Sequence, residues 1–319
     1  NSLWDTQGRD IMLSQSLPVS WATLFSSTPQ VEVELLPITD YFVVASSGAT
    51  NEAYELRAHI HEEPLATSWK GLVTGSIDPY RTLWGEKSIR FLKRKYTYPV
   101  IDENGPKDKS WYSKDKIFLA GLSLELEAAL IRGNEFFPMV TIWILYPRNE
   151  GTPLEALLAY LNTEFATERY RVNSGQESLS GGYMSLSRRN LEAIRIPESL
   201  PLDPGLIRLS RQRQSNTDEF ARLDSAVTKT LRMRLGEFEW PNRYNGEPFT
   251  WWGAGADLLR AIKRTTVPLA EVEEINGYIQ SRAREAVELL AQIETIDLQI
   301  ENRVRQLHGL EPDSNYAGS

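Results

Sequence analysis

The side chains best suited to chemistry in this sequence are cations, concentrated between residues 70 and 95. This stretch has seven basic residues against two acids, in a chain with a formal net charge of −8. The basic residues are Lys70, Arg81, Lys87, Arg90, Lys93, Arg94 and Lys95. Phe91 and Tyr96 are interleaved with the last of them, and this pattern suits phosphate contacts combined with stacking or groove insertion. The alternative is a solvated edge strand that Lys residues protect from aggregation.

A second group of candidates lies in and around a long Gly/Ser-rich stretch, residues 170–183. Loops of this length inside compact domains are usually functional or disordered. Arg, Asn and Gln side chains have the bidentate geometry that distinguishes guanine and adenine in a DNA groove. The candidate base contacts are Arg171, Asn173, Gln176, Arg188 and Arg189.

Catalytic motifs are missing from the sequence. It has no phosphate-binding Gly-Lys-Ser/Thr loop, no nucleophile elbow and no His-Glu-x-x-His pair. Asp78-Pro79-Tyr80 matches half of the Asp/Asn-Pro-Pro-Tyr motif of amino methyltransferases and, without the second Pro, indicates a turn. His59 and His61 share one face of an expected strand without a third ligand, so we interpret them as exposed residues rather than zinc ligands. The sequence therefore predicts no catalytic, cofactor or metal site in this chain.

The chain contains no Cys, which excludes disulfides and fits a reducing, cytoplasmic compartment. No window approaches the ~20 apolar residues that cross a bilayer, so no membrane partner is expected. The start lacks the basic and apolar regions of a signal peptide. Because it begins at Asn1 without an initiator Met, the sequence is expected to be either a piece of a longer protein or a chain whose first residues are not included.

Apolar patterns predict the elements that must position these side chains. Strands are expected at 31–35, 41–44, 53–56, 116–121 and 139–146. Thr152, Pro153 and Glu155 have the arrangement of a capping box, so a helix is expected from Thr152 with an apolar face that reaches Phe165.

The composition changes after Pro204, where Asn216 or Thr217 is expected to cap a helix. Residues 268–307 repeat apolar side chains at spacings of three, four or seven, which predicts a long amphipathic helix or two helices broken near Asn276-Gly277.

The predicted fold class is α+β, in three parts along the chain. Residues 1–30 are expected to be a connector or the tail of a preceding domain. Residues 31–203 are expected to form an α/β domain built on a mixed β-sheet. Residues 204–319 are expected to be mainly α-helical, as a helical hairpin or coiled coil.

Several stretches resemble, in order, the motifs of one family. They are Ser47–Asn51, Lys70–Tyr80, Lys116–Gly121, Leu157–Asn162, Gly182–Leu186 with Leu191–Pro197, and Ile296-Asp297 with Val304–Leu310. This order resembles the TaqI-like C-terminal specificity domain of adenine-specific DNA methyltransferases in type II restriction–modification systems. The resemblance covers roughly residues 40–200 and 290–312, with Thr163 where Ser is usual and His308 where Tyr is usual.

The resemblance implies double-stranded DNA as a partner and adds Thr74 to the expected contacts. It also implies that methyl transfer and S-adenosylmethionine belong to a methylase domain or subunit outside this chain, with a nuclease either fused or separate. One alternative is a stand-alone specificity subunit that docks separate methylase and nuclease subunits. Another is a protein-interaction scaffold in which the long helix is the active part.

Overall fold

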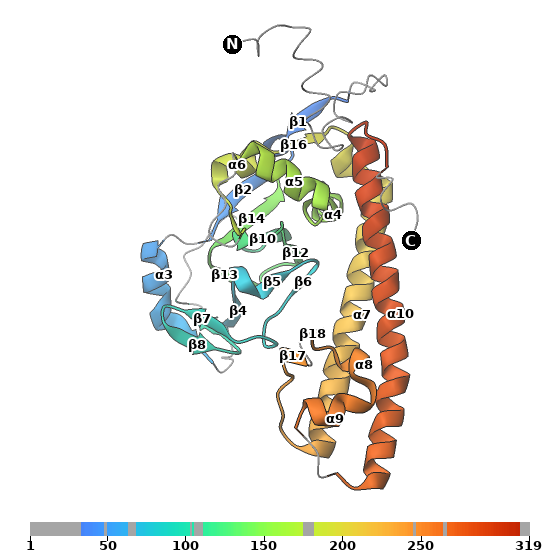
Figure 1. Ribbon diagram of the computed structural model, residues 1–319. Coiled ribbons are helices and arrows are strands. Elements are labelled where there is room, and N and C mark those ends of the chain that lie inside the picture. The colour runs from blue at the N-terminus through green and yellow to red at the C-terminus, as the bar shows by residue number, and fades with distance from the viewer. Residues whose placement is uncertain are drawn as a thin grey trace, which may run out of the picture. The chain divides into compact units, whose positions relative to one another are not determined.

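The computed structural model describes residues 33–47, 50–62, 68–102, 104, 111–174, 182–244, 247–263 and 267–312. The expected connector, the first two residues of the strand expected at 31–35, and Gln176 lie outside these residues. Of that expected strand, residues 33 and 34 are not in a strand and only Leu35 belongs to one, which continues to Pro37. The unit Glu34–Ser319 combines mixed sheets with a long C-terminal helix region (Figure 1), so the predicted α+β class is confirmed. No helix in the described ranges is long and apolar enough to cross a bilayer.

The first sheet has antiparallel neighbours in the order β12–β10–β14–β2. Its strands are β2 (Phe42–Ser46), β10 (Lys116–Ala120), β12 (Ala128–Ile131) and β14 (Ile142–Pro147). Every residue of β10 is buried, with Ile117 and Leu119 in one apolar cluster and Phe118 and Ala120 in another. This alternation identifies β10 as a central strand covered on both faces. The strands predicted at 41–44 and 116–121 are confirmed.

The second sheet has the order β13–β4–β9–β3, in which β13 and β4 are parallel. Its strands are β3 (Ile60–His61), β4 (Ser68–Val73), β9 (Val100–Asp102) and β13 (Phe136–Val140). The strand predicted at 139–146 is confirmed from Ile142 onward, as the central strand β14 of the first sheet, but residues 139 and 140 belong to β13 of the second sheet. Thr141 makes that transition with φ of 55°, a conformation that interrupts an extended strand.

The remaining strands form short antiparallel two-stranded sheets. They are β1 (Leu35–Pro37) with β16 (Arg195–Pro197), β5 (Ile77–Asp78) with β6 (Arg81–Thr82), β7 (Ile89–Phe91) with β8 (Arg94–Tyr96), β11 (Leu122–Ser123) with β15 (Met184–Ser185), and β17 (Arg243–Tyr244) with β18 (Glu247–Pro248). Single 3₁₀ turns occupy η1 (Ile38–Asp40), η2 (Arg57–His59), η3 (Thr74–Ser76), η4 (Leu200–Leu202) and η5 (Gly255–Asp257).

The strand predicted at 53–56 is wrong, since these residues belong to helix α3 (Thr50–Leu56). Ala53 and Leu56 are buried in the same apolar cluster as residues of the second sheet. Their spacing of three places both on one face of a helix, and packing against that sheet overrides the weak extended pattern.

The helix predicted from Thr152 begins later and is divided in two. Helix α4 (Glu155–Leu161) has no side-chain cap, and α5 (Glu164–Asn173) begins after Thr163, whose hydroxyl accepts from Ala166 N. Between them, the Asn162 amide bonds both the N–H and the C=O of Ala128 in β12, at 2.8 and 3.0 Å. The capping-box prediction is wrong, because the helix begins at Glu155 and the Glu155 carboxylate pairs with Arg132 and Arg211 instead. The single helix is divided because the sheet holds Asn162, which ends α4.

Helix α7 (Pro204–Leu235) begins twelve residues before the predicted caps. Asp203 is the actual N-cap, with its carboxylate accepting from Leu206 N at 2.8 Å. Asn216 and Thr217 are buried inside the helix, where Asn216 Nδ2 donates to Gln292 Oε1 at 3.2 Å. These polar residues face another helix, which is why they do not begin one.

Helix α10 (Leu269–Leu307) is a single helix, so the predicted long helix is confirmed and the break near Asn276 is not present. It runs antiparallel to α7 (Figure 1). Arg213 pairs with Asp297 at 2.7 Å and Arg234 with Glu274 at 2.8 Å, so residue numbers rise on one helix as they fall on the other. The remaining helices are α6 (Arg188–Glu192), α8 (Trp251–Ala254) and α9 (Leu258–Ala261).

The helix pair contributes to two apolar clusters. The start of α7 and the end of α10 share a cluster with the first sheet and helices α4 to α6, through residues such as Leu206 and Ile300. The end of α7 and the start of α10 form a second cluster with the tryptophan-rich segment that connects the two helices.

Candidate nucleic-acid interface

The hairpin β7–β8 presents a group of exposed cations, Arg90, Lys93, Arg94 and Lys95, which we call the basic hairpin. Arg90 and Lys95 lie directly opposite each other on its outer face, while Lys93 and Arg94 lie at the tip. The two-residue turn has φ of 44° at Leu92 and 69° at Lys93. Positive φ at both central residues matches the strand twist of a tight hairpin, although Gly or Asn usually supplies it.

The inner face of the basic hairpin is part of the core. Phe91 is 3% exposed and Tyr96 is 6% exposed, and both pack in a cluster with α3 and the second sheet. The stacking or insertion expected of these two aromatic side chains is therefore wrong in this structure. Because both rings pack into the core beneath the hairpin, the exposed surface of the basic hairpin consists of its cations without these aromatic side chains.

The charge of the basic hairpin is not neutralised within the described ranges. None of its four cations forms an ion pair with another described residue, whereas Arg132, Arg213 and Arg303 pair with nearby carboxylates. Like charges directly opposite on an antiparallel pair are destabilising. The Arg90–Lys95 pair therefore costs stability, and an external anion would offset that cost.

The other predicted cations near the hairpin have internal partners. Lys70 Nζ lies 2.5 Å from Glu135 Oε1 and 5.1 Å from the ring centroid of Trp84. Arg81 is 16% exposed and pairs with Glu86. Lys87 is exposed. Its positive charge lowers the pKa of Asp78 and Glu127, although both carboxyls remain raised overall.

Burial and neighbouring acids raise the pKa of Glu127 to about 7, with burial the larger cause and Asp78 next. A folded-state pKa above the unfolded value means that folding stability is lost as pH rises from about 4.5 to 7. We therefore expect Glu127→Gln to raise the free energy of unfolding by about 1–2 kcal/mol at pH 8, a value reduced for solvent screening, and to change little at pH 4.5. Urea unfolding at both pH values measures this, and an equal effect at both would contradict it.

A second surface brings together predicted residues that are distant in sequence, and we call it the β11–β15 edge. The Thr74 hydroxyl accepts from Leu122 N at 3.1 Å and donates to Leu122 O at 3.2 Å. Arg171 Nη2 donates to Leu124 O at 2.5 Å. Thr74 and Arg171 therefore hold neighbouring parts of one loop, and Asn173 ends helix α5 just beyond Arg171.

Helix α6 continues the β11–β15 edge. Its N-cap Ser187 donates its backbone N–H to the Tyr170 hydroxyl at 3.1 Å, so α6 is fastened to α5. Arg188 and Arg189 are both exposed on this helix, and Arg188 Nε pairs with Glu192 Oε1 at 2.8 Å. The predicted base contacts that the structure describes therefore cluster here, separate from the residues of the basic hairpin.

The sequence analysis missed two apolar members of this edge. Leu122 is 36% exposed and Leu124 is 47% exposed, while Ser123 between them is 3% exposed. The alternation Leu122-Ser-Leu-Glu-Leu126 predicts buried leucines and exposed polar residues. Leu126 and Glu125 follow this pattern, whereas residues 122–124 have the opposite orientation, which the sequence does not indicate.

His59 and His61 acquire the third group that the sequence lacked. Asp102, on the neighbouring strand β9, lies 3.0 Å from His59 Nδ1 and 3.1 Å from His61 Nε2. Burial raises the pKa of Asp102, but hydrogen bonds from His61 and His59 outweigh it and leave the pKa below its usual value. No group of three potential ligands among the described residues has the geometry to hold a metal ion.

The comparisons with known proteins add no identification. No protein-family model matches this chain, and no curated protein does either. What the chain does is therefore inferred from its residues and their geometry.

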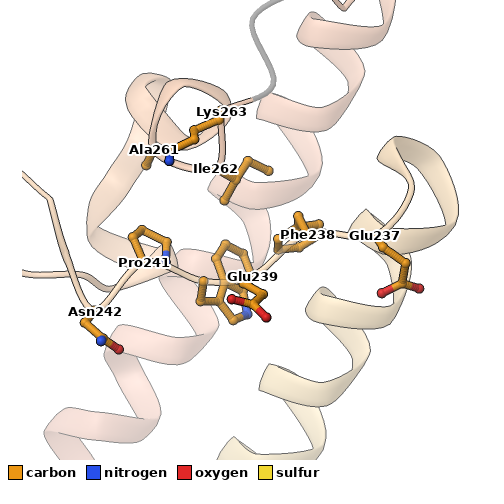
Figure 2. A pocket seen from close by; sticks show the side chains of 9 residues that line it. Glu237, Phe238, Glu239, Pro241, Asn242, Ala261, Ile262 and Lys263 are labelled. Atoms are coloured by element: carbon orange, nitrogen blue, oxygen red, sulfur yellow. The ribbon is translucent and has the colours of Figure 1, made fainter.

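A pocket at the C-terminal end of α7 lies between residues 237–242 and 261–263 (Figure 2). Its lining includes Phe238, Trp240 and Ile262, which belong to the apolar cluster at that end of the helix pair. Trp240 Nε1 donates to Thr228 Oγ1 at 3.0 Å, and its ring stacks on Phe249 with centroids 5.5 Å apart. These contacts explain the tryptophans of this segment as packing residues.

Proposed function

We propose that this chain is the DNA target-recognition portion of an adenine-N6 DNA methyltransferase from a restriction–modification system. The observation that supports it most strongly is the pair Arg90–Lys95, two cations opposite each other without a described acidic partner. Phosphates of duplex DNA would relieve their repulsion and release counterions on binding.

The two surfaces have different roles in this proposal. The basic hairpin contacts the phosphate backbone, which gives affinity without sequence information. The β11–β15 edge presents Arg171, Asn173, Arg188 and Arg189 to base edges, which gives specificity. Lys70 and Arg81 support the fold around the hairpin rather than DNA, because Glu135 and Glu86 pair with them.

The transfer chemistry belongs elsewhere in this proposal. S-adenosylmethionine and the adenine pocket are assigned, on the resemblance alone, to a methylase domain or subunit outside this chain. Sequencing the reading frame upstream of Asn1 tests the assignment. A methylase fold with an Asn/Asp-Pro-Pro-Tyr loop would support a fused enzyme, and a start codon shortly upstream of Asn1 would support a separate specificity subunit.

The scaffold alternative receives less support from the helix pair. The apolar residues of α10 that would dimerise in a coiled coil, such as Ile275 and Ile279, are 0% and 1% exposed. They pack with Leu223, Val227 and Leu231 of α7 in the same chain. This seam is therefore filled within one chain and is not available to a second copy.

Charge reversal of the basic hairpin tests the proposal. We expect Lys93→Glu, Arg94→Glu and Lys95→Glu together to weaken binding to every duplex by about 10- to 100-fold at 100 mM salt. The slope of log affinity against log salt should fall by about 3, since each lost phosphate contact removes ~0.9. Fluorescence anisotropy of labelled 30-base-pair duplexes between 50 and 300 mM salt measures both.

A matched control reverses the same number of charges on the helix pair, at Arg222, Lys229 and Arg284, which are all exposed. This variant is expected to bind like the parent chain. Equal losses in the two variants would remove the basic hairpin from the interface. Binding without any salt dependence would contradict the proposed function itself.

A further inference from the structure

The β11–β15 edge carries exposed apolar side chains whose arrangement is unusual for a surface. Leu122 and Leu124 point to solvent, whereas Ser123 is 3% exposed and donates its hydroxyl to the carbonyl of Glu125. An apolar–polar alternation normally buries its apolar members, because that face packs on the core. Leu126 follows this rule, but at residues 122–124 the polar residue lies inside and both leucines lie outside, which indicates a function for these two leucines outside the core.

Hydrogen bonds fix the backbone beneath these leucines. Thr74 bonds both the N–H and the C=O of Leu122, and Arg171 donates to the C=O of Leu124. Strand β15 pairs with β11 in the register Leu122↔Ser185 and Ser123↔Met184. The leucines are therefore presented on a rigid support, as an inserting side chain requires.

Tyr183 extends the same exposed group. It is 45% exposed and directly follows Gly182, and a side chain at Gly182 would touch Leu124 Cδ2 at 3.9 Å. Gly182 has φ of 82°, a conformation that glycine adopts without strain. The register Leu122↔Ser185 and Ser123↔Met184, continued by one residue, places Tyr183 opposite Leu124 on the face that carries Leu122. We call these three exposed residues, Leu122, Leu124 and Tyr183, the apolar wedge.

The surroundings of the apolar wedge favour a polyanion as its partner. Arg171 bonds the wedge backbone, and Arg188 and Arg189 follow on α6. Glu125, the acid beside Leu124, is a residue type that accepts from the N4 donor of cytosine in DNA grooves. Apolar side chains bordered by arginines fit the bases and phosphates of a duplex.

We propose that the apolar wedge inserts between base pairs of bound duplex DNA and unstacks them. Apolar side chains that enter a base step kink the duplex and allow it to contact more protein surface. This inference rests on the proposed function. It extends that function by proposing that three uncharged residues distort the bound DNA.

The test uses 30-base-pair duplexes enriched from a random pool by the parent chain, with 2-aminopurine replacing each adenine in turn. Binding of the parent chain is expected to increase 2-aminopurine fluorescence at the unstacked step. We expect Leu124→Ala with Tyr183→Ala to abolish the increase and weaken binding about tenfold, without changing the salt slope, since no phosphate contact is removed.

A matched control replaces two exposed apolar residues of the helix pair, Met233 and Leu269, which are 72% and 75% exposed. That variant is expected to retain both the affinity and the fluorescence increase. A fluorescence increase that survives in the wedge variant, or no increase with the parent chain bound, would overturn the wedge and leave the proposed function intact. Failure of the parent chain to bind any duplex would overturn both.

Discussion

Lys116→Met is expected to lower the free energy of unfolding by about 3 kcal/mol. Lys116 is 0% exposed, at the start of the central strand β10. Its ammonium donates to Tyr112 O at 3.0 Å, to Lys114 O at 2.9 Å and to Gly133 O. Methionine keeps the stem of the side chain but leaves three carbonyl groups without this donor, and an unsatisfied buried acceptor costs ~1–3 kcal/mol.

Burial lowers the pKa of Lys116 to about 8, and Asp115 opposes part of that shift. The three carbonyl partners match the three N–H donors of the charged form, so the ammonium is the species that fits the site. Urea unfolding followed by tryptophan fluorescence at pH 7 measures the effect of Lys116→Met. The control is Lys114→Met, since that side chain is exposed. Similar, small losses in the two variants would show that the three carbonyls find other partners.

The second large effect is a loss of stability in mild acid that depends on His308. The ring of His308 lies against Phe165 and Tyr160, with centroids 4.6 and 5.9 Å apart, and its Nδ1 lies 2.8 Å from Val304 O. Burial lowers the pKa of His308 to about 4. The neutral ring therefore docks the end of α10 onto helices α4 and α5.

The pKa of this histidine is lower in the folded protein than in the unfolded chain. At pH values between these two pKa values, the unfolded chain therefore binds more protons than the folded protein. The contribution of His308 to the free energy of unfolding is therefore fully present above pH ~6.5 and is lost as pH decreases toward 4. We expect this group to account for about 2 kcal/mol of that loss, and His308→Tyr to remove it. Urea unfolding of both proteins at pH 4.5, 5.5, 6.5 and 7.5 measures the difference.

Glu127 titrates in the same range, since burial and neighbouring acids raise its pKa to about 7. Its contribution is common to both proteins, so the difference between parent and variant isolates His308. Parallel stability curves over the whole range would contradict the prediction. A free energy of unfolding of the variant that rises by about 2 kcal/mol relative to the parent between pH 6.5 and 4.5 would support it.

The sequence by itself determined the elements whose signals are local. The apolar repeat of residues 268–307 requires only neighbouring turns of one helix, and α10 follows it closely. The alternative interpretation of the basic stretch, a strand with its lysines in solvent, is also local, and β7–β8 has that arrangement. The α+β class was predictable because it depends on such local patterns rather than on their partners.

Tertiary structure decided everything that depends on a distant partner. Asn162 ends a helix because β12 holds its amide, and Asn216 lies inside a helix because Gln292 faces it. Asp102 joins His59 and His61 from a strand that is more than forty residues away.

In the candidate interface, too, some features could be predicted from the sequence and others depend on the tertiary structure. The charges of the basic hairpin were visible in the sequence because charge is a property of residue type. The burial of Phe91 and Tyr96 was not visible, nor was the exposure of Leu122 and Leu124. A local pattern shows which residues share a face, but only the elements packed on that face determine whether it meets the core or the solvent.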